Sequence, residues 1–235
     1  MKIIVKCFSL LYLSAILFCS CTKEPDNPVT KNFIVSDYKK VETGDQHRIT
    51  ITRGSGFSVV AKGEQRDINE LIVRVNNGIL KFEYNQYRAN RKRVYLTITL
   101  PSLEGINLSG QSEATVSGFA ETNLVQLNVS GQSACWVNMN APKFLLEASG
   151  QSKIEFQGGT STGFQGYASG QSEILAYGLS TVVSADVTAE GQSVIKVKVG
   201  NIFKANASGQ SRIYYQGDPL ISQITATGDA KVVKQ

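Results

Sequence analysis

Hydrophobic and polar residues alternate with period two along most of the second half of this sequence. Around residue 127, for example, Leu127 and Val129 alternate with the polar residues Gln126 and Asn128. Such alternation is typical of β-strands with one buried face, because successive side chains point to opposite sides of the strand. A helix would require a period of about 3.6 residues, which this region does not show. The pattern therefore predicts a series of short, half-buried strands.

The tetrapeptide Ser-Gly-Gln-Ser interrupts these strands at steps of 18 to 21 residues. Copies begin at Ser109, Ser130, Ser149, Ser169 and Ser208, with a variant at Glu190 and a decayed copy at Thr227. A fixed period of this length is typical of a solenoid, in which each repeat forms one coil stacked on the last. Equivalent strands would pair in parallel, about 4.8 Å apart. We predict an all-β fold, a single-stranded parallel β-helix, which is right-handed if it follows the usual hand of parallel crossovers.

Each residue of the tetrapeptide has a structural explanation. Glycine adopts positive φ without penalty, so the repeated glycine predicts a corner that runs along the whole solenoid. Stacked Gln and Ser residues would then form ladders between coils. The alternative is that this stripe binds a glycan or another ligand, and the sequence leaves open whether the Gln side chains point inward or outward. The expected ladder consists of Gly110, Gln111, Ser112, Gly131, Gln132, Ser133, Gly150, Gln151, Ser152, Gly170, Gln171, Ser172, Gly191, Gln192, Ser193, Gly209, Gln210 and Ser211.

The first part of the chain lacks the tetrapeptide but keeps the pattern of strands. Asn76-Asn77-Gly78 lies between two expected strands and predicts a hairpin turn. We expect residues 33–104 to form the opening coils and a strand-rich cap, and residues 105–235 to form the repeat coils of the same single domain, 33–235. Strands are expected at residues 33–35, 47–52, 57–61, 71–75, 79–84 and 94–100.

Basic and aromatic residues interleave in the segment 84–95, between two expected strands. Such a segment can bind acidic glycans, lipid headgroups or nucleic acid. The simpler alternative is a solvated loop. The candidate ligand-binding residues are Tyr84, Tyr87, Arg88, Arg91, Lys92 and Arg93.

Residues 1–20 have the pattern of a secretory signal peptide, with a basic start followed by an apolar run. Ser20 directly before Cys21 resembles a lipobox, so we expect Cys21 to be the first mature residue and to carry a lipid that attaches the protein to a membrane. The alternative is an ordinary cleaved signal peptide. Residues 21–32 are polar and hold two prolines, which predicts a flexible tether. Its charge resembles the export signal of surface lipoproteins of Gram-negative bacteria, which favours the cell surface over the periplasm-facing alternative.

The remaining composition excludes several kinds of chemistry. Without Lys2 and Lys6 the 24 Lys and Arg fall to 22 against 19 Asp and Glu, a net charge of +3, and we expect no nucleic-acid partner. Cys135 falls at an apolar position of the repeat and is expected in the core. The one histidine, His47, has polar neighbours and is expected at the surface. We predict no catalytic residue, cofactor or metal site.

The segment Gly105-Ile106-Asn107, followed by the recurring Ser-Gly-x-Ser units, resembles the family "putative auto-transporter adhesin, head GIN domain". The resemblance extends over nearly all of residues 33 to 235. It implies a β-helical bacterial surface protein with a role in adhesion, and it brings no catalytic residues.

We therefore expect a non-enzymatic adhesin or interaction module, a surface lipoprotein of the outer membrane that presents a β-helical wall to glycan or protein ligands. The alternatives are a carbohydrate-active β-helix enzyme with an unrecognised acidic site, and a purely structural stalk. Asp186 and Glu190 lie four residues apart, about 13 Å in a strand, which is too far for a retaining pair of carboxylates. The open end of a solenoid also makes an oligomer plausible.

Overall fold

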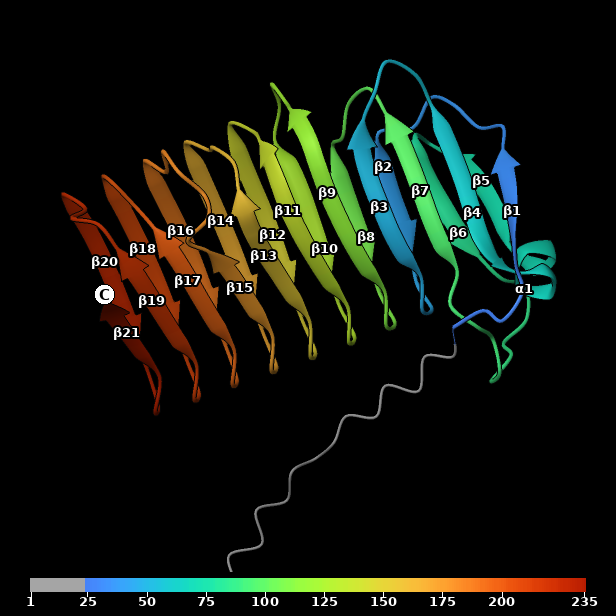
Figure 1. Cartoon of the computed structure of the whole chain (residues 1–235). Helices are drawn as coiled ribbons and strands as arrows, with labels where there is room; N and C mark the ends of the chain where they lie inside the picture. Colours follow the sequence, from blue (N-terminus) through green and yellow to red (C-terminus); the bar gives the residue numbers. More distant parts are fainter. Residues whose placement is uncertain (1–23) are drawn as a thin grey trace, which may run out of the picture.

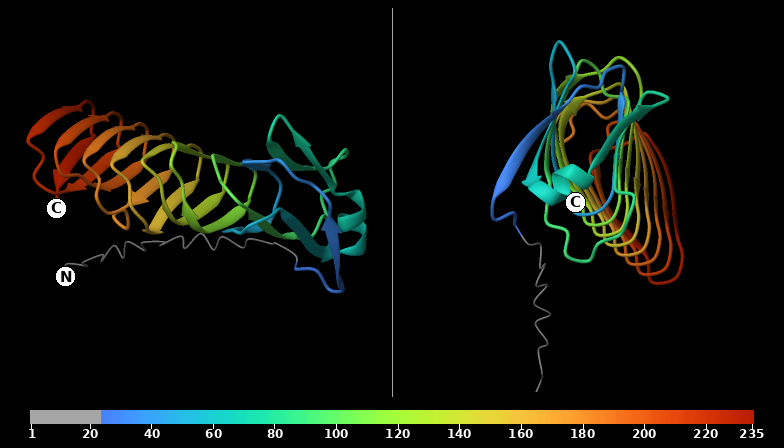
Figure 2. Two further views of the ribbon diagram at one scale, coloured as in Figure 1. Left: turned by 90° about the horizontal axis from the view of Figure 1, so that it is seen from above. Right: turned by 90° about the vertical axis from the view of Figure 1, so that its right-hand side faces the viewer.

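The computed structural model describes residues 24–235, which form a flattened parallel β-solenoid (Figure 1). Each coil contributes one strand to each of two facing sheets, one of eleven strands and one of ten. Figure 2 shows the coils stacked along one axis around an oval cross-section. The predicted all-β fold with stacked, parallel coils is therefore confirmed.

The bounds of the strands follow the predicted spacing of about 20 residues. The sheet of eleven has the spatial order β1 (Pro28–Phe33), β4 (Ser58–Glu64), β7 (Tyr95–Leu100), β3 (Arg48–Arg53), β9 (Glu113–Ala120), β11 (Ala134–Asn140), β13 (Lys153–Gly158), β15 (Glu173–Ala176), β17 (Val194–Lys198), β19 (Arg212–Gln216) and β21 (Lys231–Lys234). The sheet of ten has the order β20 (Ile221–Ala226), β18 (Ile202–Ala207), β16 (Ser184–Ala189), β14 (Gly163–Ala168), β12 (Lys143–Ala148), β10 (Val125–Val129), β8 (Gly105–Leu108), β2 (Lys40–Thr43), β6 (Ile79–Glu83) and β5 (Ile72–Asn76). One short helix, α1 (Gln65–Glu70), lies at the N-terminal end.

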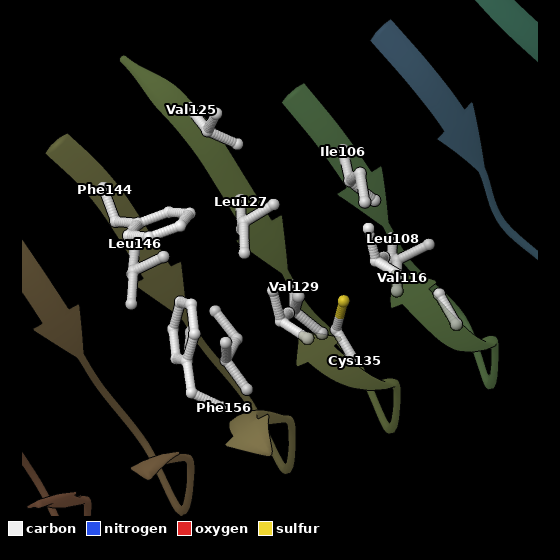
Figure 3. Close-up of a cluster of buried hydrophobic side chains, with 14 of the residues drawn as sticks. Ile106, Leu108, Val116, Val125, Leu127, Val129, Cys135, Phe144, Leu146 and Phe156 are labelled. Carbon is white, nitrogen blue, oxygen red and sulfur yellow. The ribbon is translucent and has the colours of Figure 1, made fainter. Parts of the chain in front are cut away.

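The core consists of rows of equivalent apolar side chains between the two sheets. Leu127 pairs in register with Ile106 on one side and Leu146 on the other, and Figure 3 shows these side chains lying in the same interior. Cys135 belongs to the same core with 1% of its surface exposed. Burial raises the pKa of its thiol to about 12, which confirms the prediction of a core residue.

The repeated tetrapeptides form the narrow turns along the lower edge of Figure 1. The glycine of each copy has positive φ, between 69° and 76°, as predicted. The Gln side chains point outward. Gln111 Nε2 donates to Gln132 Oε1 at 2.8 Å, and hydrogen bonds between side-chain amides continue from coil to coil as far as Gln210, with distances of 2.9 to 3.1 Å. This confirms the glutamine ladder and answers the question of orientation that the sequence left open.

The second serine of each tetrapeptide points inward and is buried. Its hydroxyl does not extend a serine ladder. Instead, in five of the six copies it donates to a main-chain carbonyl of the preceding coil, as in the bonds from Ser193 Oγ to Ala168 O and from Ser211 Oγ to Ala189 O, both 2.9 Å. The exception is Ser133, whose Oγ accepts from the Ser112 amide at 3.3 Å. The serine therefore satisfies a hydrogen-bonding group in the interior, where an unpaired hydroxyl would be costly.

In the N-terminal part the order of coils in space differs from their order in the chain. The β2–β3 coil lies against the first repeat coil, β8–β9, and the β6–β7 coil lies outside it. Strands β1, β4 and β5 then pair antiparallel at the end of the stack, where α1 is also found. The predicted hairpin is confirmed, with Asn76 opposite Ile79, whereas β2 and α1 were not expected from the sequence.

Strand β1 begins at Pro28, inside the segment 21–32 that the sequence suggested as a flexible tether. The expectation of flexibility is wrong for residues 28–32, because they pair with β4 and cover an edge that would otherwise be open. The signal peptide and Cys21 lie outside the described residues. Within residues 24–235, no helix has the length and apolar character that crossing a membrane requires.

Candidate functional site

The β2–β3 coil contains a corner that aligns residue by residue with the tetrapeptide. Thr43 pairs with Leu108 and Arg48 pairs with Glu113, so the residues between them, Gly44 to His47, take the places of Ser109 to Ser112. Asp45 stands at the glycine position and has a φ of 61°. Its carbonyl accepts a hydrogen bond from the amide of the next coil, as the motif glycines do. This stretch is therefore an unrecognised, diverged copy of the repeat.

His47 occupies the place of the buried serine, and the expectation of a surface histidine is wrong. Only 2% of its surface is exposed. Its Nδ1 lies 2.5 Å from the hydroxyl oxygen of Thr43, and its Nε2 lies 3.4 Å from that of Tyr84. Burial first, and then the charge of Arg91, lower the pKa of His47 to about 4. The imidazole is therefore neutral at pH 7.

In the outermost coil the same corner is expanded into a long loop. Strand β6 ends at Glu83 and β7 begins at Tyr95, so residues 84–94 replace a four-residue turn. This loop is the segment that hangs below α1 at the lower right of Figure 1. It holds all six candidate residues that the sequence predicted.

The positive charges of the loop are paired with carboxylates. Arg88 forms ion pairs with Asp67 and with Glu70, the latter at 3.3 Å. Arg91 lies 2.9 Å from Glu70 and also stacks over the ring of Tyr84, 3.4 Å from its centroid. Helix α1 supplies both acids. The hydrogen bond from Arg66, followed by that from Arg91, lowers the pKa of Glu70, so this carboxylate is ionised at neutral pH.

The remaining two basic residues of the loop are also engaged. Lys92 pairs with Asp26 and lies 3.7 Å from Glu64. Arg93 lies 3.7 Å from Glu24 and 3.6 Å from Glu113, and only 6% of its side chain is exposed. The basic side chains of the loop thus fold onto acidic groups that are distant in the sequence. The simpler interpretation of a solvated loop still holds for the rest of the segment, where Asn85, Gln86, Tyr87, Ala89 and Asn90 are exposed.

A cavity of about 390 Å³ lies between this loop and the corner of the β2–β3 coil. Five of the six predicted residues line it, namely Tyr84, Tyr87, Arg88, Arg91 and Lys92. Arg93 does not. The structure thus brings most of the candidates together, although the role of these residues in binding stays a prediction.

Three other lining residues come from a stretch of the sequence where no site was expected, and another belongs to the stripe that the sequence offered as an alternative binding face. Asp45, Gln46 and His47 come from the diverged corner, and Gln111 is the first amide of the glutamine ladder. The sequence did contain a sign of the diverged corner. Ile49 and Ile51 follow Gln46 at the same spacing at which apolar residues follow the glutamine of each repeat. Within residues 24–235, no group of three or more His, Cys, Asp or Glu side chains is arranged to hold a metal ion.

A second feature that the sequence analysis overlooked is the outer face of the eleven-stranded sheet. Trp136 is half-buried on this face and is flanked in register by Thr115 and Glu155. Further along the same row, Lys196 lies 5.7 Å from the ring centroid of Tyr214, with which it pairs. The sequence could have predicted this position, because Trp136 lies between the buried residues Cys135 and Val137 and must therefore point to the outer face of the strand.

The fold and these surfaces define a parallel β-solenoid protein with a polar corner cavity beside its capped end. The family model described as "Putative auto-transporter adhesin, head GIN domain" matches residues 37–219, and the chain belongs to this family. By its name, the family is one of cell-surface adhesins. No curated protein shows a significant match to the sequence.

Several solved structures share the fold at low sequence identity. A "putative adhesin" from Bacteroides fragilis NCTC 9343 superposes with a TM-score of 0.82 at 18% identity, over 89% of this chain and 98% of that one. A "putative adhesin" from Parabacteroides merdae ATCC 43184 gives 0.67 at 16% identity, over 90% and 98%. A "putative lipid binding protein" from Parabacteroides distasonis ATCC 8503 gives 0.64 at 18% identity, over 89% and 97%. At these identities the likeness is one of fold.

Proposed function

We propose that this chain is a non-enzymatic adhesin, anchored at the cell surface through a lipid on Cys21, that presents the wall of its repeat coils to glycan or protein ligands. The wall is the outer surface of both sheets along the repeat coils, strands β8 to β21. The observation that carries this proposal is where the described chain begins. Glu24 lies 3.7 Å from Arg93, and Asp26 pairs with Lys92, so the chain enters beside the cap. The repeat coils extend from that cap in one direction (Figure 1).

Covalent geometry then orients the molecule. Glu24 is three positions after Cys21, and three residue steps span at most about 11 Å when fully extended. A lipid on Cys21 would therefore hold the capped end close to the bilayer, while the long axis leaves the repeat coils free to project. An exposed wall of regular rows, with Trp136 half-buried on one face, suits a surface that binds by many shared contacts.

The chemistry of the polar groups supports a role without catalysis. In the corner cavity both nitrogens of His47 lie against hydroxyl groups. Among the residues that the structure describes, Asp45 is the one carboxylate that lines the cavity, whereas glycoside hydrolysis generally uses two. On the wall, Glu190 accepts a hydrogen bond from the Tyr167 hydroxyl at 2.7 Å.

The experiment has two parts. Antibody labelling of intact cells tests display, and loss of the label in Cys21→Ala tests the anchor. A glycan array with the mature chain, followed by a turnover assay on every polysaccharide that binds, tests adhesion. We expect binding without product, weakened in Trp136→Ala and unchanged in Leu124→Ala, which removes an exposed side chain elsewhere. Product formation, or unlabelled intact cells, would overturn the proposal.

A further inference from the structure

We infer that the corner cavity is a separate binding site for an uncharged saccharide. Its volume of about 390 Å³ falls in the range of small-molecule sites, roughly 300 to 1,000 Å³. Neither the wall nor the membrane anchor is needed for this inference. It depends on the aromatic, amide and charged groups around the cavity.

An exposed aromatic ring lines the cavity. Tyr87 has 93% of its surface exposed, so its ring is available to a ligand. The other tyrosine, Tyr84, has one face covered by the Arg91 guanidinium. Tyr87 is therefore the free platform, and rings of this kind offer an apolar face and a polar edge to a partially polar ligand such as a sugar.

The polar groups of the cavity are mostly uncharged. Gln46, Gln86 and Gln111 contribute amides, each of which can both donate and accept hydrogen bonds, as sugar hydroxyls require. Gln111 is also the first member of the ladder: its Nε2 donates to Gln132, and no side chain among the described residues donates to its Oε1. The ladder thus ends in an amide oxygen beside the cavity.

The charges of the cavity disfavour an acidic ligand, although the loop is rich in basic residues. Arg88 and Arg91 are held by Asp67 and Glu70, and Lys92 is held by Asp26. An incoming carboxylate or sulfate would have to compete with the acids that already pair with these three side chains. Asp45 lines the cavity without an ion pair among the described residues, and its charge would repel an anion further.

The test is calorimetric titration of the mature chain with uncharged gluco-, galacto- and manno-oligosaccharides from disaccharide to tetrasaccharide. Each is compared with the same oligosaccharide that carries one uronic acid. We expect an uncharged member to bind at least about tenfold more tightly than its acidic counterpart. Its affinity should change less than about twofold between about 0.05 and 0.5 M salt, because no net charge is neutralised.

Three variants sharpen the test. Tyr87→Ala should weaken binding of the uncharged sugar by about tenfold, whereas Leu220→Ala, which removes another highly exposed side chain in the turn before β20, should leave it unchanged. Glu70→Gln frees guanidinium donors, so it should raise the affinity for the acidic sugar and leave the uncharged one unaffected. Circular dichroism with thermal unfolding confirms that each variant is folded.

The inference is overturned if the acidic sugars bind more tightly, if no uncharged sugar of the panel binds, or if Tyr87→Ala binds like the unmodified chain. These outcomes leave the proposed adhesin function intact, because that proposal is tested on intact cells and with Trp136→Ala on the wall. Conversely, loss of surface labelling would leave the result for the cavity unchanged.

Discussion

The same corner occurs in this molecule in two forms, a tight one in the repeat coils and a diverged one in the β2–β3 coil. A Cβ atom added to Gly131 would lie 2.6 Å from the carbonyl oxygen of Gly110 on the preceding coil. Asp45 stands at the equivalent place with nearly the same φ, 61° against 73°, yet it carries a side chain. Positive φ alone therefore does not explain the glycine, and the backbone of the neighbouring coil does.

The neighbour of Asp45 explains the difference. In the outermost coil the tight turn is replaced by the loop 84–94, so the turn that would crowd the Asp45 Cβ is missing from its neighbour. The same opening makes room for an imidazole where the repeats have a serine, and it creates the corner cavity. One longer turn thus removes the need for glycine at the neighbouring corner and forms one side of the candidate site.

The strongest way to break this comparison is to give a repeat glycine a side chain. We expect Gly131→Ala to lower the free energy of unfolding by about 3 kcal/mol, the sum of left-handed strain and a backbone clash that cannot relax in a stacked coil. Gly56→Ala is the control, because an added Cβ there meets nothing within 4 Å. Urea unfolding followed by circular dichroism measures both. If Gly131→Ala and Gly56→Ala unfolded at the same urea midpoint, neighbouring coils would have to move apart easily. The close approach of the coils would then not explain the glycine.

A second prediction concerns the diverged corner and pH. The pKa of His47 is lowered to about 4 in the folded chain by burial and by Arg91, against about 6.5 when unfolded. Because the unfolded state then binds more protons, the stabilisation is complete above pH 6.5 and is lost as the pH falls toward 4. The groups that face the ring, Tyr84 and Thr43, have hydroxyls that are uncharged in this range.

We expect the unmodified chain to lose about 2 kcal/mol of stability from this one group between pH 7 and pH 5. His47→Ser, which restores the residue of the repeat, should lose about 2 kcal/mol less over the same interval. The urea midpoint of each chain is measured at pH 7 and at pH 5, and the change is compared between the two chains. Groups that titrate equally in both chains do not contribute to this comparison. A parallel decline of the two chains would mean that His47 is not a buried neutral group.

The repeat coils were predictable from sequence because every coil solves the same packing problem with the same residues. The period of Gly131 and Gly150 predicted a corner, and the parity of Cys135 predicted burial. The diverged corner was missed because Asp45 and His47 are recognisable as replacements only when Thr43 is known to lie beside Leu108. Helix α1 is too short for a periodic signal, and its acids pair with basic residues that are about 20 positions away in the chain. Such long-range pairing also explains why the loop 84–94 seemed a free basic patch.

A smaller effect is expected from the inward serine of the tight corner. Ser193→Ala removes the bond to the Ala168 carbonyl, and we expect it to cost about 1 kcal/mol of stability. The cost stays modest because the same carbonyl also accepts the main-chain amide of Glu190 at 2.9 Å. Ser55→Ala, at an exposed turn, is the matched control. A loss of more than about 3 kcal/mol would mean that the amide of Glu190 does not compensate for the missing hydroxyl, and that the coil depends on the serine.

The smallest effect should come from the glutamine ladder, although it is the most regular feature of the tight corners. Gln151 accepts a hydrogen bond from the side-chain amide of Gln132 at 2.9 Å and donates one to that of Gln171 at 3.1 Å. These side chains are exposed, so water replaces both bonds when the amide is removed. We therefore expect Gln151→Ala to cost only about 0.5 kcal/mol, near that of Gln223→Ala on the exposed strand β20. If the ladder variant instead cost several times more than its control, the amides would be cooperative, and the corner would owe its stability to side chains as much as to the close approach of its glycines.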